Sequence, residues 1–205
     1  MVRPHYLLLF LLLPFLAIAC ADDDDDATPG GKNLLPGSTE AVCAFVGETS
    51  FATLESFGFD FNEGTDPLDF TGTFLMDLLV QETSNIPGDT RDGDGFNTAL
   101  FTFSDLEPAS RSLRFRSTNE DAETTDTYYT TSGDDFTVVA RLTYTLGSAN
   151  PTQLYAISGT LTPDGLQNPQ YAIIILDDDG DPGNVLLDVG LGRLLIDEDG
   201  LAVRR

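Results

Sequence analysis

Histidine and tryptophan are almost missing from this chain of 205 residues. The single histidine is His5, near the start, and tryptophan does not occur. Serine and cysteine nucleophiles are normally activated by a histidine base, so Ser-His-Asp and Cys-His catalytic arrangements are excluded for a domain that follows the N-terminal segment. Zinc, copper and non-haem iron sites built on imidazole ligands are excluded for the same reason.

Cysteine is also scarce, with Cys20 and Cys43 as the only two. Two thiols cannot form a metal site of four cysteines. Cys43 lies in the apolar run 41–46, which favours a small buried side chain over a reactive thiol. If Cys20 carries no other modification, a Cys20–Cys43 disulfide is the open alternative.

Positive charge is the third shortage. Lys32 is the only lysine, and ten lysine and arginine residues stand against 34 aspartate and glutamate residues, for a formal net charge of −24. Such a surface repels nucleic acid and anionic lipid heads, so no nucleic-acid partner is expected. Two explanations of the acidity stay open: a surface adapted to high salt, and the binding of divalent cations.

Residues 1–19 have the pattern of a secretory signal peptide. Arg3 supplies a basic start, an apolar run extends from Leu7 to Ile18, and small residues precede Cys20. The run has 12 residues. A helix that spans a bilayer needs about 20, so the segment is too short for a transmembrane anchor.

The four residues Ala17-Ile18-Ala19-Cys20 resemble the lipobox of bacterial lipoproteins. In that family the thiol receives a diacylglycerol, and cleavage before the cysteine leaves a membrane-anchored protein. The family prefers Leu three residues before the cysteine, where this chain has Ala17, and the same residues fit an A-x-A cleavage site. The resemblance implies lipid attachment at Cys20, with plain secretion as the alternative.

Residues 20–40 are expected to form a flexible acidic spacer. The five consecutive aspartates from Asp22 to Asp26 repel one another and stay solvated, and Gly, Pro and Ser are frequent after them. By resemblance, an acidic run just after a lipidated cysteine implies delivery to the outer membrane and the cell surface of a Gram-negative bacterium. The family's Asp signal for inner-membrane retention would stand directly after the cysteine, where this chain has Ala21.

Residues 41–205 show a dominant period of two, which predicts a single antiparallel β domain. In Phe136 to Leu146, apolar residues alternate with mostly polar ones, as in a half-buried strand. No stretch shows a sustained helical period with caps. We expect an all-β fold, an antiparallel β-sandwich with a β-barrel as the alternative. The expected strands are 41–46, 50–61, 70–80, 98–103, 111–117, 126–131, 136–146, 153–162, 171–176, 185–189 and part of 193–203, with 136–162 forming a hairpin.

Three acidic loops contain the hard oxygen ligands that calcium prefers. In the first, Asp177, Asp179 and Asp181 alternate and predict a calcium loop, although Pro182 stands where an EF-hand requires Gly. The second holds a weaker set of ligands, Asp92, Asp94 and Asn97. The third is the run 197–200. An acidic turn without a metal is the alternative for each loop.

These observations favour an exported, membrane-anchored lipoprotein with a non-catalytic β domain that serves as a cell-surface binding or adhesion module. Its expected partner is a cell-surface protein or a glycan, and Ca²⁺ is the one candidate cofactor. The alternatives are a structural envelope lipoprotein without a ligand and a glycoside hydrolase that uses two carboxylates. No motif among the acidic residues selects a catalytic pair, and no phosphate loop or nucleophile elbow occurs.

Overall fold

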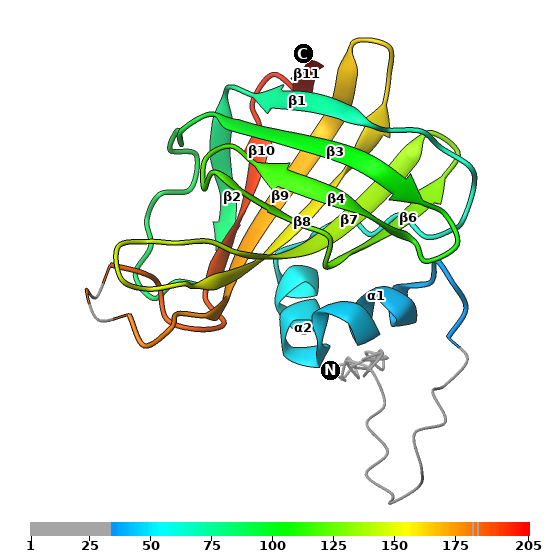
Figure 1. Cartoon of the computed structure of the whole chain (residues 1–205). Coiled ribbons are helices and arrows are strands. Elements are labelled where there is room, and N and C mark those ends of the chain that lie inside the picture. Colours follow the sequence, from blue (N-terminus) through cyan, green and yellow to red (C-terminus); the bar gives the residue numbers. More distant parts are fainter. Residues whose placement is uncertain (1–33, 182, 184) are drawn as a thin grey trace, which may run out of the picture.

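The computed structural model describes residues 34–181, 183 and 185–205, which form two short helices and eleven strands (Figure 1). The signal-type segment, Cys20 and the run of aspartates lie outside the described residues. The helices and strands are α1 (Thr39–Val46), α2 (Glu48–Ser56), β1 (Gly72–Met76), β2 (Leu79–Ser84), β3 (Ala99–Glu107), β4 (Ser112–Ser117), β5 (Ala122–Thr124), β6 (Thr127–Ser132), β7 (Asp135–Thr143), β8 (Thr152–Leu161), β9 (Gly165–Asp177), β10 (Gly192–Asp197) and β11 (Leu201–Arg204).

All eleven strands belong to one antiparallel sheet. Its order is β5-β4-β3-β1-β11-β9-β8-β7-β6, while β10 pairs with β9 and β2 beside this path. The sheet is open and does not close into a barrel. It folds over so that β1, β3 and β4 cross in front of β7, β8 and β9 (Figure 1). The predicted all-β antiparallel fold is confirmed, and its layering is that of a sandwich.

An aromatic core fills the space inside the folded sheet. Phe74, Phe101 and Phe103 reach it from β1 and β3, and Tyr155 and Tyr171 reach it from β8 and β9. All five side chains are at most 3% exposed. Because burial of a large aromatic side chain stabilises a fold by about 2–3 kcal/mol, this cluster is the main apolar core of the domain.

The helices cover the outer face of β7, β8 and β9, which corrects the prediction of strands at 41–46 and 50–61. The Ser38 hydroxyl caps α1 by accepting a hydrogen bond from the backbone N–H of Ala41. Val42, Cys43 and Val46 then recur at helical spacing and are buried against the sheet. The apolar run 41–46 carries no polar alternation, and in so short a run the period does not separate a helix from a strand.

Burial of both faces also changes the expectation for the strand after Phe136. Val138 and Ala140 face the aromatic core, while Val139 faces the helices, so β7 is buried on both sides. The predicted hairpin 136–162 is confirmed, since β7 pairs with β8 from Asp135↔Thr160 to Thr143↔Thr152. Neither described helix is long and apolar enough to cross a membrane.

Two other expected strands differ from the structure, and one strand was not expected. The run 70–80 is interrupted at Asp77 and Leu78, which separate β1 from β2. Residues 185–189 form no strand, and Val185 and Val189 are 70% and 55% exposed. The short strand β5 was not predicted. In each case the pairing partner decides the outcome, because isolated strand patterns are stable only where a neighbour completes their hydrogen bonds.

We predict that Leu54→Ala lowers the free energy of unfolding by about 2–5 kcal/mol, because the Leu54 side chain is fully buried between α2 and the sheet. Chemical denaturation of the purified protein measures the change. Glu55→Ala, at the next and exposed position of the same helix, is the matched control and should change stability by less than about 0.5 kcal/mol. Equal losses in the two variants would contradict the packing of α2 on the sheet.

Candidate metal centre

Two chain connections meet at one edge of the folded sheet. The first is the link between β1 and β2, formed by Asp77 and Leu78, and the second is the turn from β10 to β11. They meet because β1 pairs with β11 and β2 pairs with β10. The backbone N–H of Glu198 donates a 2.9 Å hydrogen bond to the carbonyl oxygen of Leu78, which joins the two connections directly.

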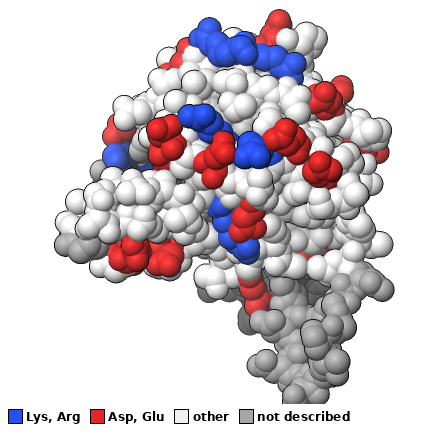
Figure 2. All heavy atoms as spheres, viewed as in Figure 1, with Lys and Arg blue, Asp and Glu red and all other residues white. Residues whose placement is uncertain are grey.

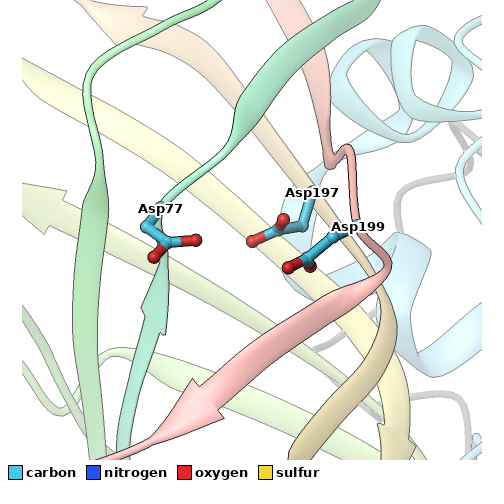
Figure 3. Close-up of side chains that lie close together, drawn as sticks. All are labelled: Asp77, Asp197 and Asp199. Carbon is cyan, nitrogen blue, oxygen red and sulfur yellow. The ribbon is translucent and has the colours of Figure 1, made fainter.

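Three carboxylates converge at this junction. Asp77 belongs to the first connection, Asp197 is the last residue of β10, and Asp199 lies in the turn that follows. One oxygen from each lies within 4.8 Å of an oxygen from the other two. Figure 3 shows the carboxylate of Asp77 aimed across the junction at that of Asp197, with Asp199 beside it. Among the described residues, this is the one group of carboxylates close enough to share a metal ion.

Asp197 is buried without a partner. Its exposed fraction is 4%, and neither of its carboxylate oxygens has a hydrogen-bond partner. Asp77 and Asp199 are exposed. Within the described residues no arginine forms an ion pair with any of the three, so the charge of Asp197 is not neutralised by a side chain. A buried carboxylate in this state is costly, because it loses hydration and gains no hydrogen bond in return.

The electrostatics of Asp197 follow from this burial. Loss of hydration raises the pKa of Asp197 to about 6, and the neighbouring Asp199 and Asp77 carboxylates contribute to the rise. Both effects oppose the ionised form. In the protein without a bound cation, Asp197 is therefore easier to protonate than an ordinary aspartate.

A second buried polar group lies on the same face of the sheet. Gln81 in β2 is 2% exposed, and its side-chain oxygen has no hydrogen-bond partner, while its amide nitrogen donates to Asp92 at 3.0 Å. In the ladder between β2 and β10, Gln81 pairs with Leu195 and Leu79 pairs with Asp197. Gln81 and Asp197 are therefore diagonal neighbours on one face.

The predicted calcium loop after β9 uses its carboxylates differently. Asp177 accepts the N–H of Asp179, and Asp179 accepts the N–H of Asn150. Asp181 accepts the N–H groups of Val185 and Leu186. The structure does not bring the three carboxylates together within metal-binding distance of one another. Each one instead orders the backbone of its own loop or of the neighbouring loop.

The weaker candidate loop, before β3, lies along β2. Asp92 accepts the hydrogen bond from Gln81, the carbonyl oxygen of Asp94 accepts the N–H of Gln81, and Asn97 is exposed. Asp92 and Asp94 belong to no group of three or more described carboxylates close enough to share a metal ion. Their contacts hold the loop against the edge of β2.

Cys43 is buried, as its apolar surroundings predict, with an exposed fraction of 2%. Cys20 is the only other cysteine of the chain and lies outside the described residues. Because one sulfur atom cannot carry a lipid thioether and a disulfide together, lipid attachment at Cys20 and a disulfide between the two cysteines exclude each other within one molecule.

A cleft of about 860 Å³ opens elsewhere on the domain. Its walls come from the residues before α1, the segment before β1, the end of β3 with the connection that follows it, and β6. They are mostly apolar and include Pro36, Pro67, Leu106, Pro108 and Ala109. The cleft is separate from the carboxylate junction, since none of the three aspartates lines it. Its size falls within the range of about 300–1,000 Å³ that is typical of ligand pockets.

Arg111 forms part of the cleft wall and is 6% exposed. Its guanidinium donates to the carbonyl oxygen of Tyr129 at 3.0 Å and to the Thr131 hydroxyl at 2.9 Å. It also lies over the Tyr129 ring, 4.1 Å from the centroid. Burial raises the pKa of Tyr129, and the charge of Arg111 partly offsets that rise. These contacts fix a cation and an aromatic ring at one wall of the cleft.

The aromatic side chains are packed, and no described phenylalanine or tyrosine is fully exposed. The adjacent Tyr128 and Tyr129 point to opposite faces of β6, as neighbouring residues of a strand do. Tyr128 stacks with Phe45 of α1 at 6.1 Å, and Tyr129 packs on Phe70 in the core. No two aromatic side chains of the exposed class therefore lie side by side among the described residues.

Charge on one face of the domain is mixed. Figure 2 shows basic side chains lying beside acidic ones. Arg114 pairs with Asp105 and Glu123, and Arg116 pairs with Asp121, all on exposed side chains. Such pairs contribute little to stability, about 0–1 kcal/mol each. The face in Figure 2 is therefore no uniform anionic patch.

No family model, curated protein or solved structure matches this chain.

Sequence reasoning identified two of the three converging residues only in part. The run 197–200 was singled out as an acidic loop, but Asp77 lay within the expected strand 70–80 and was not considered a ligand. Asp77 and Leu78 interrupt an otherwise apolar run, and this interruption is the local signal of a chain break. Asp197, which lies across the junction from Asp77, follows it by more than a hundred residues in the sequence. The local sequence therefore could not show that the two residues meet.

We predict that Asp197→Asn stabilises the metal-free protein at pH 8. The pKa of the Asp197 carboxyl group is about 4 in the unfolded chain and about 6 in the folded protein. The stability of the wild-type protein therefore falls as the pH rises from about 4 to about 6. Above that window the full penalty, of the order of 2 kcal/mol, is present in the wild type and absent from the variant. Urea unfolding in EDTA at several pH values measures the difference, which should vanish below pH ~4. A constant difference at all pH values would contradict the explanation.

Proposed function

We propose that this chain is an exported bacterial lipoprotein, anchored through Cys20 in the outer membrane at the cell surface, and that its β domain is a non-catalytic binding module. The observation that carries the proposal is the sequence Ala17-Ile18-Ala19-Cys20 directly after a basic start and an apolar run. Two or three acyl chains at this position hold a protein on a membrane, since each buried methylene contributes about 0.8 kcal/mol.

The cleft supports the binding role. It combines apolar walls with the fixed cation of Arg111, a combination typical of sites that recognise a partner by shape and by few polar contacts. A protein segment is the partner class that this surface favours, because proline and leucine side chains line the walls and no exposed ring pair is present for a sugar among the described residues.

The glycoside hydrolase alternative gains no support from the cleft. Asp66 and Asp69 are the carboxylates that line it. Asp69 accepts hydrogen bonds from the side chain and the backbone N–H of Thr71, and these bonds lower the pKa of Asp69. A general acid for glycoside cleavage needs the opposite, a raised pKa.

The anchor predicts that the wild-type protein fractionates with membranes and that Cys20→Ser releases it into the soluble fraction. Mass spectrometry of the N-terminal peptide should show acyl chains on Cys20, and protease added to intact cells should degrade the wild-type protein if it faces outward. A Cys20 found in a disulfide with Cys43 would overturn the lipid anchor. Accumulation of the protein in the inner membrane would overturn only its placement at the surface.

The cleft predicts a binding defect in Ala109→Arg, because the added side chain occupies the cleft from its rim without touching the core. Labelled purified protein is titrated onto whole cells of the producing strain, and the variant should bind at least ~10-fold more weakly. Ser110→Arg adds the same charge at the neighbouring exposed position, outside the cleft lining, and should bind like the wild type. Saturable binding that is equal in all three proteins would place the binding surface elsewhere, and no binding would favour a structural role.

A further inference from the structure

We propose that Asp77, Asp197 and Asp199 bind a calcium ion, and that this ion joins the β1–β2 connection to the β10–β11 turn. The inference is independent of the lipid anchor and of the cleft. It also differs from the calcium loop expected at Asp177, Asp179 and Asp181, because it uses residues from two distant parts of the chain.

The spacing of the carboxylates fits a shared ion. Calcium binds oxygen ligands at about 2.3–2.6 Å, so two ligands of one ion are at most about 5 Å apart. The closest oxygens of Asp77, Asp197 and Asp199 lie within 4.8 Å of one another. All three side chains reach this position from rigid points, the ends of β1 and β10 and a turn held by its own hydrogen bonds.

The unpartnered carboxylate of Asp197 is the observation that turns an acidic cluster into a site. Asp197 is 96% buried, calculated from its exposed fraction of 4%, and both of its oxygens lack a hydrogen-bond donor. It faces Asp77 and Asp199 (Figure 3). Three negative groups at this separation repel one another, and a cation between them would convert that repulsion into attraction and would satisfy the buried oxygens.

The ligand chemistry selects a hard divalent cation. The three side chains offer only carboxylate oxygens and no nitrogen or sulfur, which disfavours zinc and copper. Calcium accepts six to eight oxygen ligands in flexible geometry, whereas magnesium demands a near-ideal octahedron. Asp77 and Asp199 are exposed, so water can supply the remaining calcium ligands from the solvent side.

Calcium binding at this junction would stabilise the folded state. The two connections are already joined by the hydrogen bond from Glu198 to Leu78, and the ion would add bonds on both sides of that contact. An ion that binds only the folded protein raises its thermal midpoint in proportion to the logarithm of the ion concentration.

The test is a thermal melt and a calorimetric titration of the purified protein with calcium chloride after dialysis against EDTA. We expect the thermal midpoint to rise with millimolar calcium, and to rise less with magnesium or with sodium chloride of equal ionic strength. Asp197→Asn and Asp77→Asn should weaken calcium binding by at least ~10-fold and should abolish the rise. Asp197→Asn removes a buried charge without changing volume, so the variant is expected to fold.

Two further variants make the result specific. Glu198→Gln removes the same charge from the same turn but no ligand, and it should keep the calcium response of the wild type. Asp179→Asn tests the loop after β9. The proposal is overturned if calcium acts no better than sodium chloride, if Asp197→Asn keeps the response, or if Asp179→Asn rather than Asp197→Asn removes it. A calcium response that is lost in Asp197→Asn and Asp77→Asn and kept in the other two variants supports it.

Discussion

The whole architecture depends on the burial of β8 and β9 on both faces. Six consecutive residues of β8, from Gln153 to Ser158, are buried, and β9 carries apolar residues on both sides of the sheet. Such strands are stable only when both faces are covered. The helices cover one face, and the folded-over half of the same sheet covers the other. β9 also pairs with three neighbours, β8, β10 and β11.

The position of the carboxylate junction follows from this constraint. Because the sheet must fold over to cover β8 and β9, β1 reaches β11, and β2 reaches β10. The two connections between these strand pairs then lie at the same edge. Asp77 therefore lies near Asp197 and Asp199 because of the way in which the sheet covers its own core. No local sequence pattern relates Asp77 to the other two residues.

The sequence predicted the fold wherever the two sides of a strand differ. The alternation of apolar and mostly polar residues in Phe136 to Leu146 predicted a strand there and the hairpin 136–162, although β7 is buried on both sides in the structure. Residues 41–46 were predicted as a strand, but they form a helix. The cap at Ser38 and the burial of Val42 and Val46 against the sheet together stabilise that helix. That outcome depends on the sheet, which is formed by residues far along the chain.

The candidate calcium ligands illustrate the same limit. Aspartates at 177, 179 and 181 have the spacing of a metal loop, yet their oxygens accept backbone N–H groups, which is the competing use of aspartate in turns. Asp197 and Asp199 are both aspartates and lie close together in the sequence, but Asp197 is buried and Asp199 is exposed. Burial is set by the pairing of β10 with β2 and β9, so the feature that distinguishes it is absent from the local sequence.

Burial sets Asp197 apart from the acidic surface of this protein. A dense carboxylate surface adapted to high salt acts through hydration, so it requires side chains in contact with solvent. Asp197 is excluded from solvent and has no donor, hence adaptation of the surface cannot account for it. A buried acid of this kind has two ways to lose its charge, a proton or a cation. The proton needs only Asp197 and a lower pH. The cation needs the arrangement that is present, with Asp77 and Asp199 directed at the same point as Asp197.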